Sequence, residues 1–303
     1  MKLTHTAERE ARLLSILRRE LGMSSSLVGR LKYRGAFTVN GVTAFTNHPV
    51  RPGDRVEVLL DEPVPDYPAE DAPLSIIYED AWLIALDKPA GLLMHPSSAR
   101  NTGTLANRLT AYYRRTGQPC AVHPVSRLDR DTFGVVLLAK SSHVHAKMHA
   151  LQRAHGIEKV YRAVVLGIPP QSEGEIDAPI ARVAGDSLLR RIDPEGKPAV
   201  SRYRVLSSAR LGENGQPCSL LELQPLTGRT HQLRLHCARL GCPILGDPQY
   251  GTPASTALSE ALGLTGQQLC AVGLKFVHPM TGVLTEIRTE YQISLDFSCP
   301  TVV

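Results

Sequence analysis

The sequence lacks any hydrophobic run long enough to cross a membrane. Its longest strongly apolar stretches, residues 81–86 and 135–139, are far shorter than the roughly 20 residues that a transmembrane helix needs. The N-terminus, MKLTHTAEREARLL, becomes charged where a signal peptide would carry its apolar core. We therefore expect neither membrane insertion nor secretion, and predict a cytoplasmic protein.

Closely spaced cysteines are also missing, which bears on disulfides and on metals. The six cysteines are scattered and form no CxxC pair: Cys120, Cys218, Cys237, Cys242, Cys270 and Cys299. This pattern is typical of reduced thiols in a cytosol and argues against a structural zinc site. The sequence has no GxGxxG or Walker loop either. Neither a metal nor a cofactor is expected.

The composition is otherwise that of an ordinary globular protein. Of the 303 residues, 43% are hydrophobic and 21% are charged, which excludes disordered, collagen-like and coiled-coil classes. The length suits one large domain or two of unequal size. Lys and Arg outnumber Asp and Glu by 34 to 29, so the formal net charge of +5 gives a mild preference for polyanionic partners.

A proline-rich segment divides the chain. Residues 63–73, PVPDYPAEDAP, hold four prolines in eleven residues and predict a linker. Before the linker, residues 1–62 carry two short helical patterns and the hairpin signal Asn40-Gly41 between two strand-like segments. We expect a small α+β domain there. Three basic residues on or just after its second helix are predicted to face solvent: Arg30, Lys32 and Arg34.

Residues 74–303 are rich in strand patterns. Strands are predicted at 74–78, 82–87, 135–139, 161–166, 199–206 and 220–224, and helices at 141–154 and 230–240. Strands and helices do not alternate regularly, which favours a mixed, mostly antiparallel α+β domain over a doubly wound one.

The most informative motif is SRLDRDTFG, at residues 126–134. It places the carboxylate of Asp129 between two arginines, directly before a buried strand. Opposite charges nearby favour the ionised carboxylate, so Asp129 is a candidate nucleophile or base. Taken alone, the motif is more typical of a loop ion pair of Asp129 or Asp131 with an arginine.

Two further motifs favour the chemical interpretation. KVYRA, at residues 159–163, opens a strand with Tyr161 among basic residues. TGRTHQLRLH, at residues 227–236, leads from a strand into a helix, on which Arg234 is expected to project into a cleft together with His231. Their occurrence together with Asp129 predicts a reactive site.

These motifs, with DKPAG at residues 87–91, GCPILGDPQYG at 241–251 and FVHPMTG at 276–282, closely resemble the RluA family of pseudouridine synthases. The resemblance runs in order from about residue 74 to residue 290. Residues 1–62 look like the alpha-L RNA-binding fold that is often joined to that family. The resemblance implies a curved, mixed, mostly antiparallel sheet with flanking helices, which agrees with the strand-rich pattern.

The resemblance also implies the reaction, an isomerisation of uridine to pseudouridine in structured ribosomal or transfer RNA. Asp129 would be the catalytic carboxylate, Arg234 its basic partner, and Tyr161 the ring that stacks on the extracted uracil. Arg127 would fill the space that the flipped base leaves. Further RNA contacts are expected from Arg229, His231, Arg30, Lys32 and Arg34. No cofactor, membrane or obligatory protein partner is inferred. Whether Asp129 attacks the sugar or removes a sugar proton stays open.

The sequence departs from the family pattern at three positions. Ser126 and Cys270 replace histidines, and Phe133 replaces a small serine. Phe133 adds bulk close to Asp129, so a specialised substrate or reduced activity is left open.

Three other functions are compatible with parts of the sequence. A non-catalytic RNA-binding protein would retain the fold without the reaction. A metal-dependent hydrolase would use the histidines at positions 143, 145, 149 and 155, but these lack the glutamate of an HExxH motif. Asp247 resembles a second acid of a glycosidase pair, although the glycines and Pro248 around it favour a turn.

Overall fold

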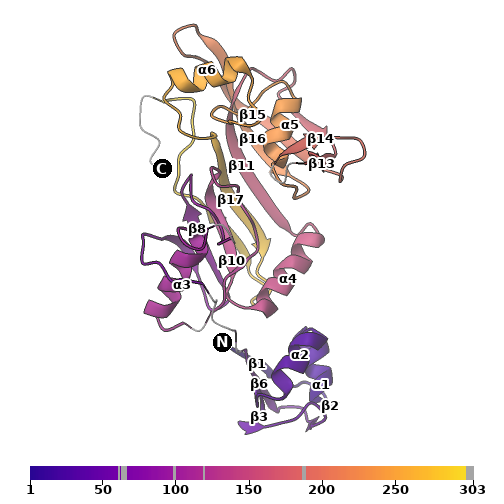
Figure 1. The fold of residues 1–303 in the computed structure, drawn as a ribbon. Coiled ribbons are helices and arrows are strands. Elements are labelled where there is room, and N and C mark those ends of the chain that lie inside the picture. Colours follow the sequence, from indigo (N-terminus) through magenta and orange to yellow (C-terminus); the bar gives the residue numbers. More distant parts are fainter. Residues whose placement is uncertain (61, 63–66, 98–99, 119, 186–188, 298–303) are drawn as a thin grey trace.

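Two parts of unequal size make up the structure (Figure 1). The computed structural model describes residues 1–60, 62, 67–97, 100–118, 120–185 and 189–297. Residues 63–66 of the predicted linker lie outside the described residues. Residues 67–74, which follow, form neither helix nor strand.

The smaller part is a four-stranded antiparallel sheet with short helices and its own apolar core. Its strands follow the order β1-β6-β3-β4. Its elements are β1 (Lys2–Thr6), β2 (Ala11–Arg12), α1 (Leu13–Ser15), the π-helical turn η1 (Ile16–Glu20), α2 (Ser25–Lys32), β3 (Phe37–Val39), β4 (Val42–Thr43), β5 (Pro49–Val50) and β6 (Arg55–Leu59). The predicted hairpin is confirmed, because Asn40 and Gly41 join β3 to β4 with φ angles of 51° and 81°.

Apolar and polar contacts join the two parts. Trp82 and Met280 of the larger part pack against the core of the smaller one. Glu62 is buried and accepts hydrogen bonds from the backbone nitrogen and the hydroxyl of Ser142, at 2.9 and 2.8 Å. Arg30 donates to the same hydroxyl at 3.1 Å. The Arg30 guanidinium therefore contacts the larger part, and its side chain is also exposed to solvent, as the sequence predicts.

A ten-stranded sheet forms the centre of the larger part. Its main order is β12-β15-β16-β11-β17-β10-β8-β7, with β18 paired to β17 and β9 paired to β10. All pairs are antiparallel except β10 with β17. The strands are β7 (Ser75–Glu79), β8 (Leu83–Lys88), β9 (His123–Pro124), β10 (Phe133–Ala139), β11 (Ile157–Leu166), β12 (Glu173–Asp177), β15 (Val200–Leu211), β16 (Gln216–Pro225), β17 (Leu269–Val277) and β18 (Leu284–Arg288). The predicted mixed, mostly antiparallel α+β architecture is confirmed.

Within the described ranges, four helices flank this sheet. α3 (Leu105–Arg115) and α4 (Ser142–Arg153) lie near one end, and α5 (Gln232–Arg239) and α6 (Pro253–Ala261) lie near the other (Figure 1). A two-stranded hairpin of β13 (Ile180–Arg182) and β14 (Arg190–Ile192) lies beside α5. The predicted helices at 141–154 and 230–240 correspond to α4 and α5.

The parallel contact between β10 and β17 depends on Gly134. Its φ is +102°, and a Cβ atom there would lie 2.3 Å from the carbonyl oxygen of Ala271. Only glycine tolerates both the backbone angle and the close approach. β10 begins one residue earlier, at Phe133, so this contact fixes the end of the loop that carries Asp129.

Two of the departures from the family pattern are neighbours in the sheet. Phe133 and Cys270 are partners across β10 and β17, and both are buried in the same apolar cluster. The ring of Phe133 packs edge-on against Tyr291, with 5.5 Å between ring centroids. The bulk of Phe133 is therefore accommodated in the core, and this side chain is not part of the cavity wall described below.

Candidate active site

The loop that carries Asp129 is held from beneath by a buried lysine. Lys88 is fully buried at the end of β8, and its Nζ donates to the carbonyl oxygens of Pro89, Leu92 and Arg130 at 2.8, 2.9 and 2.7 Å. Burial lowers the pKa of Lys88 to about 7, although the charges of Asp131 and Asp129 oppose this. The hydrogen bond to Arg130 fixes the backbone one residue after Asp129.

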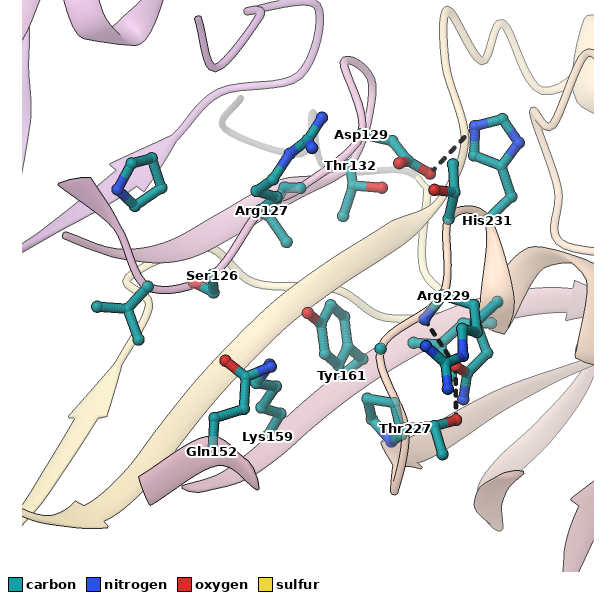
Figure 2. A pocket seen from close by; sticks show the side chains of 18 of the residues that line it. Ser126, Arg127, Asp129, Thr132, Gln152, Lys159, Tyr161, Thr227, Arg229 and His231 are labelled. Atoms are coloured by element: carbon teal, nitrogen blue, oxygen red, sulfur yellow. Dashed lines mark hydrogen bonds and ion pairs between the residues drawn. The ribbon is translucent and has the colours of Figure 1, made fainter. Parts of the chain in front are cut away.

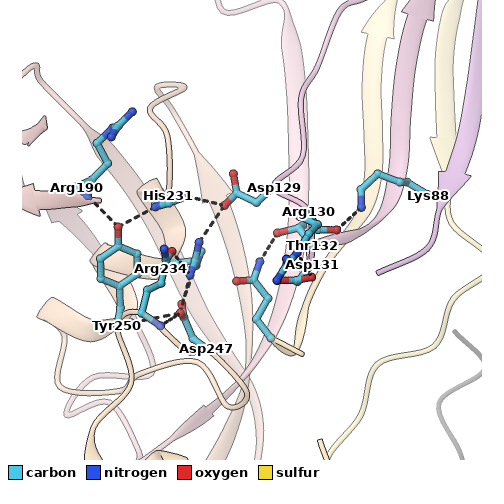
Figure 3. Close-up of polar contacts among 12 residues, drawn as sticks. Lys88, Asp129, Arg130, Asp131, Thr132, Arg190, His231, Arg234, Asp247 and Tyr250 are labelled. Carbon is cyan, nitrogen blue, oxygen red and sulfur yellow. Dashed lines mark hydrogen bonds and ion pairs between the residues drawn. The ribbon is translucent and has the colours of Figure 1, made fainter. Parts of the chain in front are cut away.

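Asp129 lies within reach of two basic side chains from the other half of the domain. Its Oδ2 is 3.5 Å from Nη1 of Arg234 and 3.8 Å from Nε2 of His231. The Asp129 side chain remains 30% exposed. The carboxylate is thus flanked by the guanidinium of Arg234 and the imidazole of His231, and it is still open to a ligand (Figure 3).

Arg234 is oriented chiefly by a second carboxylate. Its Nε and Nη2 donate to the two oxygens of Asp247 at 2.7 and 2.6 Å, and Nη2 also donates to Gln249 at 2.9 Å. Burial alone would lower the pKa of Arg234, but the hydrogen bonds and charge of Asp247, with Asp129, raise it above the ordinary value. Backbone nitrogens of Gln249 and Tyr250 donate to Asp247 in turn. The predicted turn at Asp247 is present, and it also supplies the partner of Arg234.

His231 has a left-handed backbone at the start of α5. Its φ is 57°, and the helix begins at Gln232, so His231 does not share a helical face with Arg234 as the sequence suggests. Its Nδ1 and the Tyr250 hydroxyl are 2.7 Å apart, while its Nε2 points toward Asp129. Burial lowers the pKa of His231, and Asp129 opposes that shift. Tyr250 thus links His231 to the turn that holds Arg234 (Figure 3).

These residues surround a cavity of about 380 Å³. Its wall includes Arg127, Asp129, Tyr161, Arg229 and His231 (Figure 2). The volume is typical of a small-molecule site and suits a single nucleotide unit, not a duplex. The structure therefore brings together side chains from three motifs that are far apart in the sequence.

Tyr161 comes from the central strand β11. β17 carries an extra residue, Val272, opposite the junction of Val160 and Tyr161, so the pairing shifts by one there. Burial, with a smaller contribution from Asp129, raises the pKa of Tyr161. The tyrosine is consequently neutral and offers a flat apolar ring to the cavity.

The remaining predicted RNA contacts lie in two places. Arg127 and Arg229 line the cavity, and Arg229 is steadied by a hydrogen bond to the carbonyl of Pro198 at 3.0 Å. Arg30, Lys32 and Arg34 belong to the smaller part and are absent from this wall.

The histidines on and near α4 contact one another and the backbone. His123 and His145 stack with ring centroids 5.6 Å apart, and Nε2 of His145 bonds to the carbonyl of Pro124 at 3.2 Å. Across the described ranges, no group of three or more His, Cys, Asp or Glu side chains could hold a metal ion. In the same ranges no helix combines the length and apolar character needed to cross a bilayer.

Sequence reasoning missed the parts played by Lys88, Asp247 and Tyr250. All three lie in motifs that were noticed, DKPAG and GDPQYG. The residue spacing in these motifs indicates turns and strand ends. It does not indicate which distant residues the three side chains contact in the folded protein.

Comparison with known proteins identifies the family. A family model described as RNA pseudouridylate synthase matches residues 82–239. An uncharacterized RNA pseudouridine synthase of Chloroflexus aurantiacus is 39% identical over 282 residues, covering 92% of this chain and 85% of that protein. Ribosomal large subunit pseudouridine synthase D of Zymomonas mobilis is 34% identical over 279 residues, covering 89% and 82%.

A solved structure agrees with this family. Human RNA pseudouridylate synthase domain containing 1 shares 25% identity, with a TM-score of 0.59 over 73% of this chain and 85% of that one. The chain belongs to the RNA pseudouridylate synthase family, whose members are isomerases. The resemblance drawn from the sequence motifs is thereby confirmed.

Proposed function

We propose that this enzyme converts uridine to pseudouridine in ribosomal RNA with Asp129 as its reacting carboxylate. The observation that carries the proposal is the position of Asp129, which is partly exposed on the wall of a nucleotide-sized cavity and flanked by Arg234 and His231. A carboxylate beside a fixed guanidinium and an imidazole suits either attack on the sugar or removal of a sugar proton.

The cavity also fits the handling of the base. A uridine within folded RNA is shielded by stacking and pairing, so it has to be flipped out before the bond between base and sugar can be broken. The neutral ring of Tyr161 would stack on the uracil while it turns. Arg127, exposed at the cavity, would occupy the space that the base leaves, and Arg229 and His231 would contact the RNA around it.

Ribosomal RNA is the proposed substrate class because a relative of similar length bears the name ribosomal large subunit pseudouridine synthase D. Transfer RNA is the second candidate. The formal net charge of +5 and the basic residues of the smaller part, Arg30, Lys32 and Arg34, support binding to a polyanion. We propose that the protein acts in the cytoplasm, without a cofactor and without an obligatory protein partner.

A non-catalytic RNA-binding protein with the same fold is the alternative. It would need the basic surface but not the convergence of Asp129, Arg234 and Tyr161 on one cavity. That convergence favours the enzyme.

Chemical mapping of pseudouridines in ribosomal and transfer RNA tests the proposal. RNA from cells with and without the protein is compared, and cells that carry only Asp129→Asn serve as the matched control. We expect one or a few uridines in ribosomal RNA to lose modification both without the protein and with the variant. Identical maps in all three cell types would contradict the proposed function, and a change confined to transfer RNA would select the second substrate class.

A further inference from the structure

A polar stripe on α4 reaches the cavity at a distance from Asp129. His145, His149 and Gln152 are spaced at helical intervals of four and three residues, and all three line the cavity. The reaction as proposed above uses none of them. In the view of Figure 2, Gln152 lies near Lys159, and Tyr161 lies between this pair and Asp129.

Lys159 completes the same end of the cavity. It lies two residues before Tyr161 on β11, so both side chains point to the same face of the sheet, and both line the cavity. With its amide oriented to satisfy both of its polar atoms, Gln152 donates to the carbonyl of Val125 at 3.2 Å and accepts from Nζ of Lys159 at 3.0 Å. One hydrogen bond thus places the ammonium group at the cavity wall, near the tyrosine (Figure 2).

The charge of Lys159 is not neutralised by the protein. Among the residues that the structure describes, no carboxylate forms an ion pair with it. Desolvation by burial is the cause that lowers its pKa. A partly buried cation without an anionic partner is costly unless a ligand supplies the negative charge.

We infer that Lys159, supported by Gln152 and by the histidines of α4, binds a phosphodiester of the RNA next to the flipped uridine. The inference rests on the proposed function and adds to it a phosphate subsite on the α4 side of the cavity. A phosphate suits the position because the uracil ring would lie on Tyr161, near Lys159. The phosphodiester linkages that join this uridine to its two neighbours belong to the same nucleotide unit. The subsite would set how the RNA strand enters the cavity.

The test neutralises one charge at a time on both partners. Short RNA stem-loops carry the uridine identified by the mapping experiment, with an uncharged methylphosphonate in place of the phosphate on its 5′ or its 3′ side. KM and kcat for pseudouridine formation are measured with the wild type, Lys159→Met and Lys275→Met. Lys275 is the matched control, because it is exposed on the neighbouring strand β17 and lies outside the cavity wall.

On unmodified RNA, Lys159→Met is expected to raise KM about tenfold, as for a lost charge-assisted contact, while kcat stays within about threefold. One of the two methylphosphonates should raise the KM of the wild type by a similar factor. The same methylphosphonate should not raise the KM of Lys159→Met further. Lys275→Met should behave as the wild type on every RNA.

Two results would overturn the inference. In the first, neither methylphosphonate changes the KM of the wild type. In the second, at both linkages, the methylphosphonate raises the KM of Lys159→Met by the same factor as it raises the KM of the wild type. The wild-type measurements need no variant, so they decide the question even if Lys159→Met fails to fold. Absence of turnover of unmodified RNA by the wild type would contradict the proposed function itself. Normal turnover with independent effects would contradict only the phosphate subsite.

Discussion

Both short ion-pair contacts of Arg234 are made with Asp247, at 2.6 and 2.7 Å, whereas Asp129 lies 3.5 Å away. Arg234 and Asp247 are each 5% exposed, so the pair is fixed within the protein. Asp129 therefore meets a guanidinium that is already oriented, and it keeps most of its own hydrogen-bonding capacity for the substrate. Asp247 is in this sense a positioning residue.

Replacing Asp247 should therefore weaken both stability and catalysis. Asp247→Asn leaves a buried guanidinium without its counter-charge, and we expect a loss of about 3 kcal/mol in the free energy of unfolding. Turnover should fall at least tenfold, because Arg234 is free to shift away from Asp129. Denaturant unfolding and pseudouridine formation are the measurements. Glu286→Gln, which removes an exposed ion pair of equal length, 2.6 Å, should change neither. Turnover of Asp247→Asn within twofold of the wild type would disprove the positioning role.

Asp129→Asn should abolish pseudouridine formation and leave RNA affinity within about threefold. Affinity depends mainly on phosphate contacts, which the substitution does not touch. Single-turnover assays and filter binding measure the two quantities. Activity within tenfold of the wild type, about 1.4 kcal/mol in the barrier, would remove Asp129 from its role.

The neighbouring carboxylate is the control for Asp129. Asp131 forms two hydrogen bonds of 2.9 Å with the exposed guanidinium of Arg130, and the cavity wall does not include it. Asp131→Asn should reduce turnover far less than Asp129→Asn. Equal losses in the same assay would show that the loop as a whole, and not one carboxylate, is required.

His143 should make stability depend on pH. Burial, assisted by Lys147 and opposed by Glu62, lowers the pKa of His143 to about 4, whereas the unfolded chain has about 6.5. The folded state therefore binds this proton less well. The contribution of neutral His143 to the free energy of unfolding is complete above pH 6.5. It is lost as the pH falls toward 4, at up to about 1.4 kcal/mol per pH unit.

Unfolding experiments at pH 7.5 and 5 check this expectation. The wild type should lose about 2 kcal/mol more than His143→Gln over that interval. His155→Gln, at an exposed position after α4, should keep the wild-type dependence. A parallel decline in wild type and His143→Gln would rule out His143 as the source.

Salt dependence of RNA binding should reveal whether the smaller part of the structure contacts RNA. If Lys32 contacts a phosphate, Lys32→Ala should lower the slope of log affinity against log salt by about 0.7 to 0.9. Arg30→Ala should lower it less, because the Arg30 guanidinium already bonds to Ser142 and lies 4.0 Å from Glu62. Titrations at several salt concentrations give the slopes. An unchanged slope for Lys32→Ala would show that the Lys32 ammonium group is solvated and does not contact RNA.

Chelators should not affect turnover, and no added nucleotide should be needed. The proposed reaction draws on a carboxylate and a held base, and no step assigns a role to a metal. Activity is measured before and after treatment with a chelator, on RNA that is folded beforehand in magnesium and then purified. A loss of turnover that added zinc restores would contradict this expectation and would favour a metal site at the histidines of α4.

Local patterns in the sequence were sufficient for most elements of the sheet and for two of the helices. The strands around 135–139 and 161–166 are apolar runs of the length that a central strand needs, and they lie within β10 and β11. α3 was not predicted because polar residues interrupt its apolar pattern. One of them is Asn107, which is buried and donates hydrogen bonds to two backbone carbonyls. β17 was missed for a similar reason, since Gly273 and Lys275 break its apolar pattern.

The sequence by itself determined which residue types carry the chemistry. The order of the motifs around Asp129, Tyr161 and Arg234 identified the family. Only the tertiary structure decided their partners: Asp129, before β10, and Arg234, on α5, are 105 residues apart in the chain, yet their side chains lie 3.5 Å apart. The local sequence determines the backbone conformation that a few neighbouring residues prefer. Which residue a side chain contacts depends instead on packing between segments that are distant in the chain. Asp247 shows the difference, for its turn was predictable and its ion pair was not.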